Sequence, residues 1–309
     1  MEENVYSYER KASRVDIMKY INDFLEYIEV IKKHSKNTII NYQGDIVDFY
    51  EYVNHDILNI SKDNVSEYLN KLYEEKLSKS SIARKLTSLR MFYDYLVDMN
   101  IIEENYFKNI KNPKKDKVLP KLVKDNDVQK MFLIPDTRKA IGQRNLLVIR
   151  MLYATGIRVS ELVDIKIKDI NIYDHTIRIM GKGSKERMVI FGEYTEDDLK
   201  KYLKDGRKEL DKKHSEYLLL NKDGNKLSDR YVRKIIDDII IKASIEMHVS
   251  PHMLRHTFAT QMLNNGADLV CVKDLLGHES LNTTSIYTHV SDDKIREIYE
   301  MAHPRAHKE

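Results

Sequence analysis

The stretch that divides this chain is KNIKNPKKDKVLPKLVK, residues 108–124. It holds seven lysines and two prolines against one aspartate, a net charge of +6 in 17 residues. Proline disfavours helix, and closely spaced lysines keep a backbone solvated. We therefore predict a basic linker between two domains, dense enough in charge to contact phosphate. An ordinary solvated loop is the alternative interpretation.

The segment before the linker has helical periodicity. Apolar residues recur there at spacings of three and four, the pattern of an amphipathic helix. Thr38 is predicted to cap the second of four helices, and Ser80 or Ser81 to begin the fourth. The apolar stripes of the four helices include Phe24 and Ile28, Ile46 and Phe49, Val65 and Leu72, and Leu89 and Phe92.

The segment after the linker has a mixed pattern. Residues 145–155 are typical of an apolar helix, and INIYDHTIRIMGKGSKERMVIF (170–191) alternates around a Gly-Lys-Gly turn, which predicts strand, turn and strand. Helical patterning resumes near Asp229 and ends in a short amphipathic helix around Ile295, Tyr299 and Ala302.

These patterns predict a fold that is mainly α with a small antiparallel β-sheet. An all-α N-terminal domain would precede an α+β domain. The predicted boundaries are an N-terminal extension at 1–16, a helical domain at 17–107, the linker at 108–124 and the second domain at 125–309.

Composition narrows the class of protein. With 309 residues, 42% of them hydrophobic, the chain can bury two cores, and its net charge of +3 does not by itself indicate nucleic-acid binding. The lone cysteine, Cys271, forms no internal disulfide and lies in an apolar stretch, so we expect it to be buried. No apolar run approaches the roughly 20 residues that span a bilayer, and the N-terminus lacks a secretory signal. We expect a cytoplasmic protein with no membrane partner.

Four short segments carry residues suited to catalysis. Each residue alone has an ordinary explanation, as a surface ion pair, a solvated lysine, a structural histidine or one of 20 tyrosines. The segments are ATGIRVSEL (154–162) with Arg158 and Glu161, GKGSKER (181–187) with Lys182, SPHMLRHTFAT (250–260) with His252 and Arg255, and LLGHESLNTTSIYTHV (275–290) with His278 and Tyr287.

Metal and nucleotide chemistry fit these segments poorly. His252 and His256 have zinc-binding spacing, but Met253 stands where the HExxH motif has glutamate, and no third ligand is evident. The glycine that a phosphate-binding P-loop needs before Gly-Lys-Ser is missing. No acidic cluster suits two-metal chemistry. We predict neither a metal nor a cofactor.

Taken together, the segments suit attack on a phosphodiester without metal. Two guanidinium forks can bind the non-bridging oxygens as negative charge develops on them. A tyrosine hydroxyl can form a covalent phosphotyrosyl intermediate, and a lysine or histidine can protonate the leaving oxygen.

The four segments resemble those of the tyrosine recombinase (phage integrase) family, most closely its Xer branch. Arg158 to Lys182 is 24 residues, His252 to Arg255 is 3, Arg255 to His278 is 23 and His278 to Tyr287 is 9, spacings similar to those of Xer proteins. The stretches KSSIARKLTSLRMFYDYL and YTHVSDDKIREIYEMAHPRA are also similar.

The resemblance implies a role for each residue of the site. It implies a core-binding N-terminal domain that clamps DNA together with the catalytic domain, and a C-terminal helix that docks on a neighbouring protomer. We expect DNA contacts from Thr38, Ser80, Ser81, Arg84, Lys114 and Lys115. The implied catalytic roles are a phosphate clamp (Arg158 and Arg255), a brace (Glu161), a general acid (Lys182), assistance to proton transfer (His252), a hydrogen bond to phosphate (His278) and the nucleophile of a 3′-phosphotyrosyl bond (Tyr287).

The implied partner is double-stranded DNA with two inverted half-sites, bound by a homo- or heterotetramer that joins two such sites. A second recombinase and a septal DNA translocase are open as further partners. The expected function is site-specific recombination of the Xer type, which resolves chromosome dimers. The alternatives are a mobile-element integrase, a catalytically silent DNA-binding protein on the same fold and a type IB topoisomerase.

Overall fold

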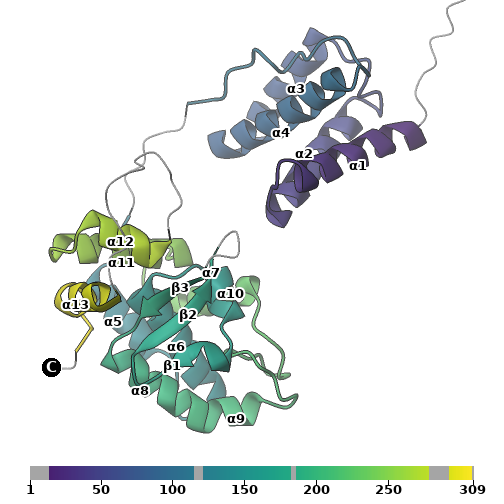
Figure 1. Ribbon diagram of the computed structural model, residues 1–309. Coiled ribbons are helices and arrows are strands. Elements are labelled where there is room, and N and C mark those ends of the chain that lie inside the picture. The colour runs from purple at the N-terminus through teal and green to yellow at the C-terminus, as the bar shows by residue number, and fades with distance from the viewer. Residues whose placement is uncertain (1–13, 115–120, 182–185, 278–291, 308–309) are drawn as a thin grey trace, which may run out of the picture. The chain divides into compact units, whose positions relative to one another are not determined.

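The computed structural model describes residues 14–114, 121–181, 186–277 and 292–307 (Figure 1). The chain divides into two compact units, Met1–Val118 and Leu119–Glu309, and each has its own hydrophobic core. Within the described ranges, no helix combines the length and the apolar character that crossing a bilayer requires.

The first unit is an all-α bundle. Residues at the predicted apolar spacing are buried, and the rings of Phe24 and Phe92 meet edge to face at 5.3 Å between centroids. Phe49 meets Phe107 in the same way at 5.3 Å, which ties the segment after the last helix to the core. The helices are α1 (Arg14–Val30), α2 (Lys36–Tyr52), α3 (Lys62–Glu74) and α4 (Lys79–Asp98).

The helix starts predicted in this unit are late by one to three positions, since Thr38 does not cap α2 and α4 begins at Lys79 rather than at Ser80 or Ser81. Helix α2 is capped by Ser35, whose Oγ accepts a hydrogen bond from the backbone N–H of Thr38 at 3.3 Å. Helix α4 is capped by Ser78, which accepts from the N–H of Ser81 at 3.1 Å. Serine and threonine three residues apart both fit the cap pattern, and the earlier one takes the role because its oxygen faces the exposed N–H groups of the first turn.

The second unit joins helices to one small sheet. Helix α6 lies at its centre and is buried along nearly all of its length, and it packs against helices on every side and against β3. Figure 1 shows α11 and α12 at one end of the unit and α8 and α9 at the other. The elements are α5 (Asp125–Leu133), α6 (Ala140–Thr155), α7 (Val159–Asp164), η1 (Ile167–Asp169), β1 (Ile170–Asn171), β2 (Thr176–Met180), β3 (Glu186–Ile190), α8 (Glu193–Lys201), η3 (Tyr202–Gly206), α9 (Arg207–Leu210), α10 (Asp229–Lys242), α11 (Pro251–Asn264), α12 (Leu269–Leu276) and α13 (Asp292–Ala302).

The sheet is antiparallel in the order β1-β2-β3, and it confirms the strand pair predicted for 170–191. Ile177 lies opposite Val189, and both side chains are buried in the core of the unit. The fold class is therefore the predicted one: mainly α, with a small antiparallel sheet in the second unit.

The prediction that helices resume only near Asp229 is wrong. Helix α8, the π-helical turn η3 and helix α9 already occupy residues 193–210. Their sequence is dominated by charged residues, and four apolar side chains in 18 residues, Leu199, Tyr202, Leu203 and Leu210, pack on the core. Leu199, Tyr202 and Leu203 have the spacing of one helical turn, but the stripe is short and stands among charged residues, so the sequence pattern did not predict the helix.

Helices α11, α12 and α13 enclose a second, smaller core in this unit. Tyr299 and Ala302 of α13 are buried there beside Phe258 and Met262 of α11. The predicted C-terminal helix therefore packs on its own domain in the single chain, an arrangement that the family resemblance did not favour. Cys271 of α12 is buried, as predicted.

Candidate active site

Arg158 and Glu161 meet at the start of α7. Helix α6 ends at Gly156 in the left-handed conformation (φ +61°), where an added Cβ would approach Phe258 to 2.5 Å. The chain then turns sharply, and Arg158 stands at the N-cap of α7 with an extended backbone. Its N–H donates to Glu161 Oε2 at 2.8 Å and its Nη1 to Glu161 Oε1 at 2.7 Å. The carboxylate thus reaches back to the helix start, as in a capping box.

Arg255 reaches the same place from α11. Ser250 caps this helix and Pro251 occupies its first turn, so the helix begins cleanly before the functional residues. Arg255 is 5% exposed, and its guanidinium donates to the carbonyl of Gly156 at 2.6 Å. His252 precedes it by three residues on the same helix and is exposed. Arg255 is therefore fixed against the turn that carries Arg158.

Three arginine side chains meet at the C-terminal end of α12. The helix ends at Gly277, which adopts φ +63°. Carbonyls at a helix C-terminus lack intrahelical partners and carry partial negative charge, so they attract cations. Three consecutive carbonyls each accept from a different arginine: Leu275 from Arg187 at 3.2 Å, Leu276 from Arg255 at 2.6 Å and Gly277 from Arg158 at 3.2 Å.

Arg187 is a residue of this site that sequence reasoning missed. It lies on β3, and its Nη1 and Nη2 donate to the two oxygens of Glu161 at 2.9 and 2.8 Å. In an alternating strand an arginine looks like an outward-facing polar position, whereas this one is on the inward side. The signal available was its place five residues after Lys182 in a segment already singled out.

Burial and charge act together on the ionisable groups of the site. Burial raises the pKa of the Glu161 carboxyl, but hydrogen bonds from Arg187 and Arg158 outweigh it and hold that pKa below its ordinary value. Burial and the neighbouring charge of Arg158 lower the pKa of Arg255 to about 10. Glu161 is therefore ionised and Arg255 protonated at neutral pH.

The predicted residues Lys182, His278 and Tyr287 lie outside the described residues, as does Lys115 in the linker. Strand β2 ends at Met180, two residues before Lys182, and α12 ends two residues before His278. The structure thus brings together Arg158, Glu161 and Arg255, with His252 one turn before Arg255 on α11.

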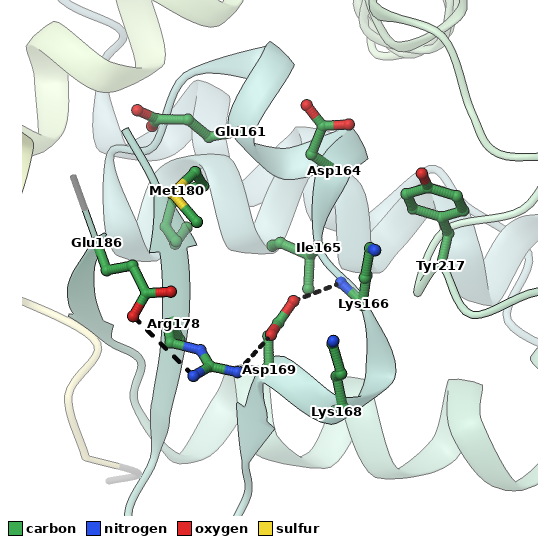
Figure 2. Close-up of a pocket in the computed structure, with 11 residues that line it drawn as sticks. Glu161, Asp164, Ile165, Lys166, Lys168, Asp169, Arg178, Met180, Glu186 and Tyr217 are labelled. Carbon is green, nitrogen blue, oxygen red and sulfur yellow. Dashed lines mark hydrogen bonds and ion pairs between the residues drawn. The ribbon is translucent and has the colours of Figure 1, made fainter. Parts of the chain in front are cut away.

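A pocket of about 380 Å³ lies beside the site, with Glu161 at one end and the Arg178–Asp169 pair at the other (Figure 2). Arg178 donates to Asp169 at 3.1 Å, and Lys166 pairs with Glu216 at 2.8 Å. Because its lining has four carboxylates beside three cationic side chains, the pocket is unlike a phosphate-binding surface. The Arg178–Asp169 pair instead ties β2 to η1.

Four of the residues expected to contact DNA lie in the first two turns of α2 and α4: Thr38, Ser80, Ser81 and Arg84. A shallow pocket of about 460 Å³ is lined there by Ser80, Ser81 and Arg84 together with Tyr42. Arg84 donates to the carbonyl of Asn41 at 3.3 Å and pairs with the buried carboxylate of Asp45. The Thr38 hydroxyl is engaged with Ser35 Oγ at 2.9 Å, and Lys114 is exposed.

Both units of the chain match family models. Residues 121–294 match the model of the phage integrase family, and residues 21–100 match the phage integrase N-terminal SAM-like domain. The tyrosine recombinase XerC of Anoxybacillus flavithermus is 42% identical over 293 residues, covering 93% of this chain and 98% of the relative. XerC of Bacillus subtilis is 38% identical over 300 residues, covering 95% and 99%.

Solved structures share the fold. A XerH site-specific recombinase in a post-cleavage complex with its palindromic difH substrate superposes with a TM-score of 0.71 at 24% identity, covering 97% of this chain and 96% of that one. A lambda integrase (75–356) dimer bound to a core site has a TM-score of 0.66 at 16% identity, covering 89% and 99%. The chain belongs to the phage integrase family and is a tyrosine recombinase, an enzyme that recombines DNA.

Proposed function

We propose that this recombinase cleaves DNA with Tyr287 as nucleophile, while Arg158 and Arg255 bind the scissile phosphate. The observation that carries the proposal is the convergence of the two guanidiniums. They donate to the adjacent carbonyls of Gly277 and Leu276, although they come from elements about 100 residues apart. Two fixed forks at one point suit the oxygens of a phosphate on which charge develops.

The remaining roles follow from the chemistry of each group. The Tyr287 oxygen attacks phosphorus, the bond to the 5′ oxygen breaks, and Lys182 gives that oxygen a proton, leaving a 5′-hydroxyl and a 3′-phosphotyrosyl bond. His252 assists removal of the tyrosine proton, and His278 donates a hydrogen bond to the phosphate. Glu161 holds Arg158 in place, as its two hydrogen bonds to that residue support. One phosphoester replaces another, so the reaction requires no ATP.

The first unit is proposed to contact the DNA backbone. The starts of α2 and α4 offer helix N-termini, which favour anions, and Arg84 stands in the pocket between them. Asp45, 2% exposed, orients Arg84 and also lies 3.6 Å from Lys85. Thr38, Ser80, Ser81, Lys114 and Lys115 would add contacts that position the protein without reading sequence.

The biological role that we favour is resolution of chromosome dimers in the cytoplasm at cell division. Relatives named XerC that match this chain over nearly all of its length support it. The substrate would be two inverted half-sites around a spacer, with four protomers joining two sites. A second recombinase and a septal translocase are the further partners to test. Genomic footprinting separates this role from that of a mobile-element integrase, which would bind at the ends of an element.

Arg158→Lys tests the proposed chemistry with little risk to the fold, because the Arg158 side chain is 39% exposed. Lysine keeps the charge and loses the two-pronged fork, so we expect cleavage of a nicked suicide substrate to fall by about 100- to 1000-fold while half-site binding persists. Arg178→Lys, at a side chain 45% exposed and also ion-paired, is the matched control and should cleave normally. Equal cleavage by wild type and Arg158→Lys would refute the phosphate clamp. The absence of any covalent adduct from wild type would favour a catalytically silent protein.

A further inference from the structure

We infer that Arg187 is a positioning residue that holds Glu161 and the end of α12 in one arrangement, and so aims Arg158 at the phosphate. This inference rests on the proposed function, since it assigns Arg187 an effect on catalysis that passes through Glu161. Arg187 is not itself placed in contact with DNA.

The position of Arg187 in the sheet is unusual for a charge. It pairs in register with Ile179, which is 2% exposed, and its next neighbour on the same face of β3 is Val189, which is 1% exposed. The Arg187 side chain is 13% exposed. A charge on the inward face of a strand costs desolvation, which is recovered when the charge is fully hydrogen-bonded.

The contacts of Arg187 recover part of that cost, because three of its five N–H donors are engaged. All three of its guanidinium nitrogens donate: Nη1 and Nη2 to the two oxygens of Glu161, and Nε to the carbonyl of Leu275. The bidentate pair fixes the plane of the carboxylate as well as its position. Each guanidinium nitrogen donates inside the protein. We therefore assign Arg187 an indirect effect on the phosphate, which passes through Glu161 and the end of α12.

Glu161 transmits this constraint to Arg158. Its carboxylate accepts from Arg187 twice and from Arg158 twice, so the two arginines share one anion that is 6% exposed. Without Arg187, both carboxylate oxygens would be available to Arg158 alone, and the Arg158 fork would turn toward Glu161. The guanidinium would then lose the direction that the proposed phosphate clamp requires.

The end of α12 is built around the same side chain. A Cβ on Gly277 would lie 3.1 Å from Cδ, Cζ and Nε of Arg187, so the left-handed glycine packs directly on the guanidinium. Leu275 and Gly277, which precede His278 in the chain, thus rest on Arg187 through a hydrogen bond and a close approach. Arg187 therefore joins three elements of the site: β3, the start of α7 and the end of α12.

The test is a double-mutant cycle with Arg187→Gln, Glu161→Gln and the double variant. Single-turnover cleavage is measured at saturating DNA, and half-site affinity is measured separately. We expect each single variant to cleave about 100-fold more slowly, with affinity within about threefold of wild type, because a small misalignment costs rate rather than binding. The double variant should be slowed by no more than about 100-fold relative to wild type, since both changes break the same Arg187–Glu161 pair.

Arg178→Gln, on the neighbouring strand, is the matched control and should cleave at the wild-type rate. If Arg187→Gln fails to fold, Arg187→Lys replaces it in the cycle, because lysine keeps the charge and cannot bridge two carboxylate oxygens and a carbonyl.

A double variant about 10⁴-fold slower than wild type would show that the two changes act independently, and would overturn the inference. Parallel losses of affinity and rate would also overturn it, since they would make Arg187 a DNA contact or a structural residue. If wild type forms no adduct, the proposed function fails and this role fails with it; if wild type cleaves and Arg187→Gln cleaves equally, only the positioning role fails.

Discussion

Gly277→Ala should be far more damaging than Gly266→Ala, although both glycines have positive φ. The two residues flank α12, with φ +63° at Gly277 and φ +94° at Gly266. Either substitution carries a left-handed backbone cost of about 1–2 kcal/mol. An added Cβ at Gly266 meets nothing within 4 Å, whereas one at Gly277 lies 3.1 Å from three atoms of Arg187.

Arg187 cannot easily move away from that Cβ. Its three donated hydrogen bonds hold it, and a shift of a few tenths of an ångström would lengthen the 3.2 Å bond to the Leu275 carbonyl and disturb the pair with Glu161. A hydrogen bond to a charged group contributes about 1.5–3 kcal/mol, so we expect Gly277→Ala to lower the free energy of unfolding by that much more than Gly266→Ala.

Urea unfolding followed by far-ultraviolet circular dichroism measures the difference, since the chain has no tryptophan. Cleavage should fall with Gly277→Ala and stay near wild type with Gly266→Ala. Stability losses that agree within about 0.5 kcal/mol would refute the reasoning that Gly277 packs against a fixed Arg187.

Three further predictions concern the proposed chemistry and the fold. Lys182→Ala should slow cleavage strongly with little effect on binding, and a 5′-bridging phosphorothioate, whose sulfur leaves without a proton, should restore it; failure of this rescue would argue against a general acid. Neutralising three linker lysines should weaken binding to all DNA sequences alike. The slope of log affinity against log salt concentration should become shallower by up to about 0.9 for each lysine that neutralises a phosphate. An unchanged slope would mean that these lysines are merely solvated. Those lysines are Lys114, Lys115 and Lys117. Truncation after Ser291 should lower stability by at least about 3 kcal/mol, because Tyr299 is buried on its own domain; unchanged stability with impaired cooperative assembly would instead favour docking on a neighbouring protomer.

The periodic part of the fold could be predicted from the sequence. Buried stripes such as Phe24 with Ile28 recur at helical spacing, and Ile177 alternates toward the core as a strand residue should. Helix α8 could not be predicted in this way, because Leu199 is the one apolar residue among its two buried positions, Thr195 and Leu199, and most of its other residues are charged. The caps differ from the prediction because Ser35 and Thr38 both satisfy the same local pattern.

The candidate site was predictable where it depended on residue type and spacing. Arg158, Glu161 and Arg255 could be selected because their chemistry and order in the chain are shared with a family. Arg187 could not, since its partners are 26 and 88 residues away and its inward orientation depends on the register of β3. The convergence of arginines on the end of α12 is likewise a tertiary feature that no local pattern contains.

The central claim, that Tyr287 is the nucleophile, is tested most directly by trapping the covalent intermediate. Phenylalanine keeps the ring and removes the hydroxyl, so Tyr287→Phe should leave half-site binding almost unchanged. On a labelled suicide substrate nicked beside the scissile phosphate, wild type should yield a protein–DNA adduct that survives SDS and maps to Tyr287, and Tyr287→Phe should yield none. An adduct of wild-type yield from Tyr287→Phe would contradict the mechanism.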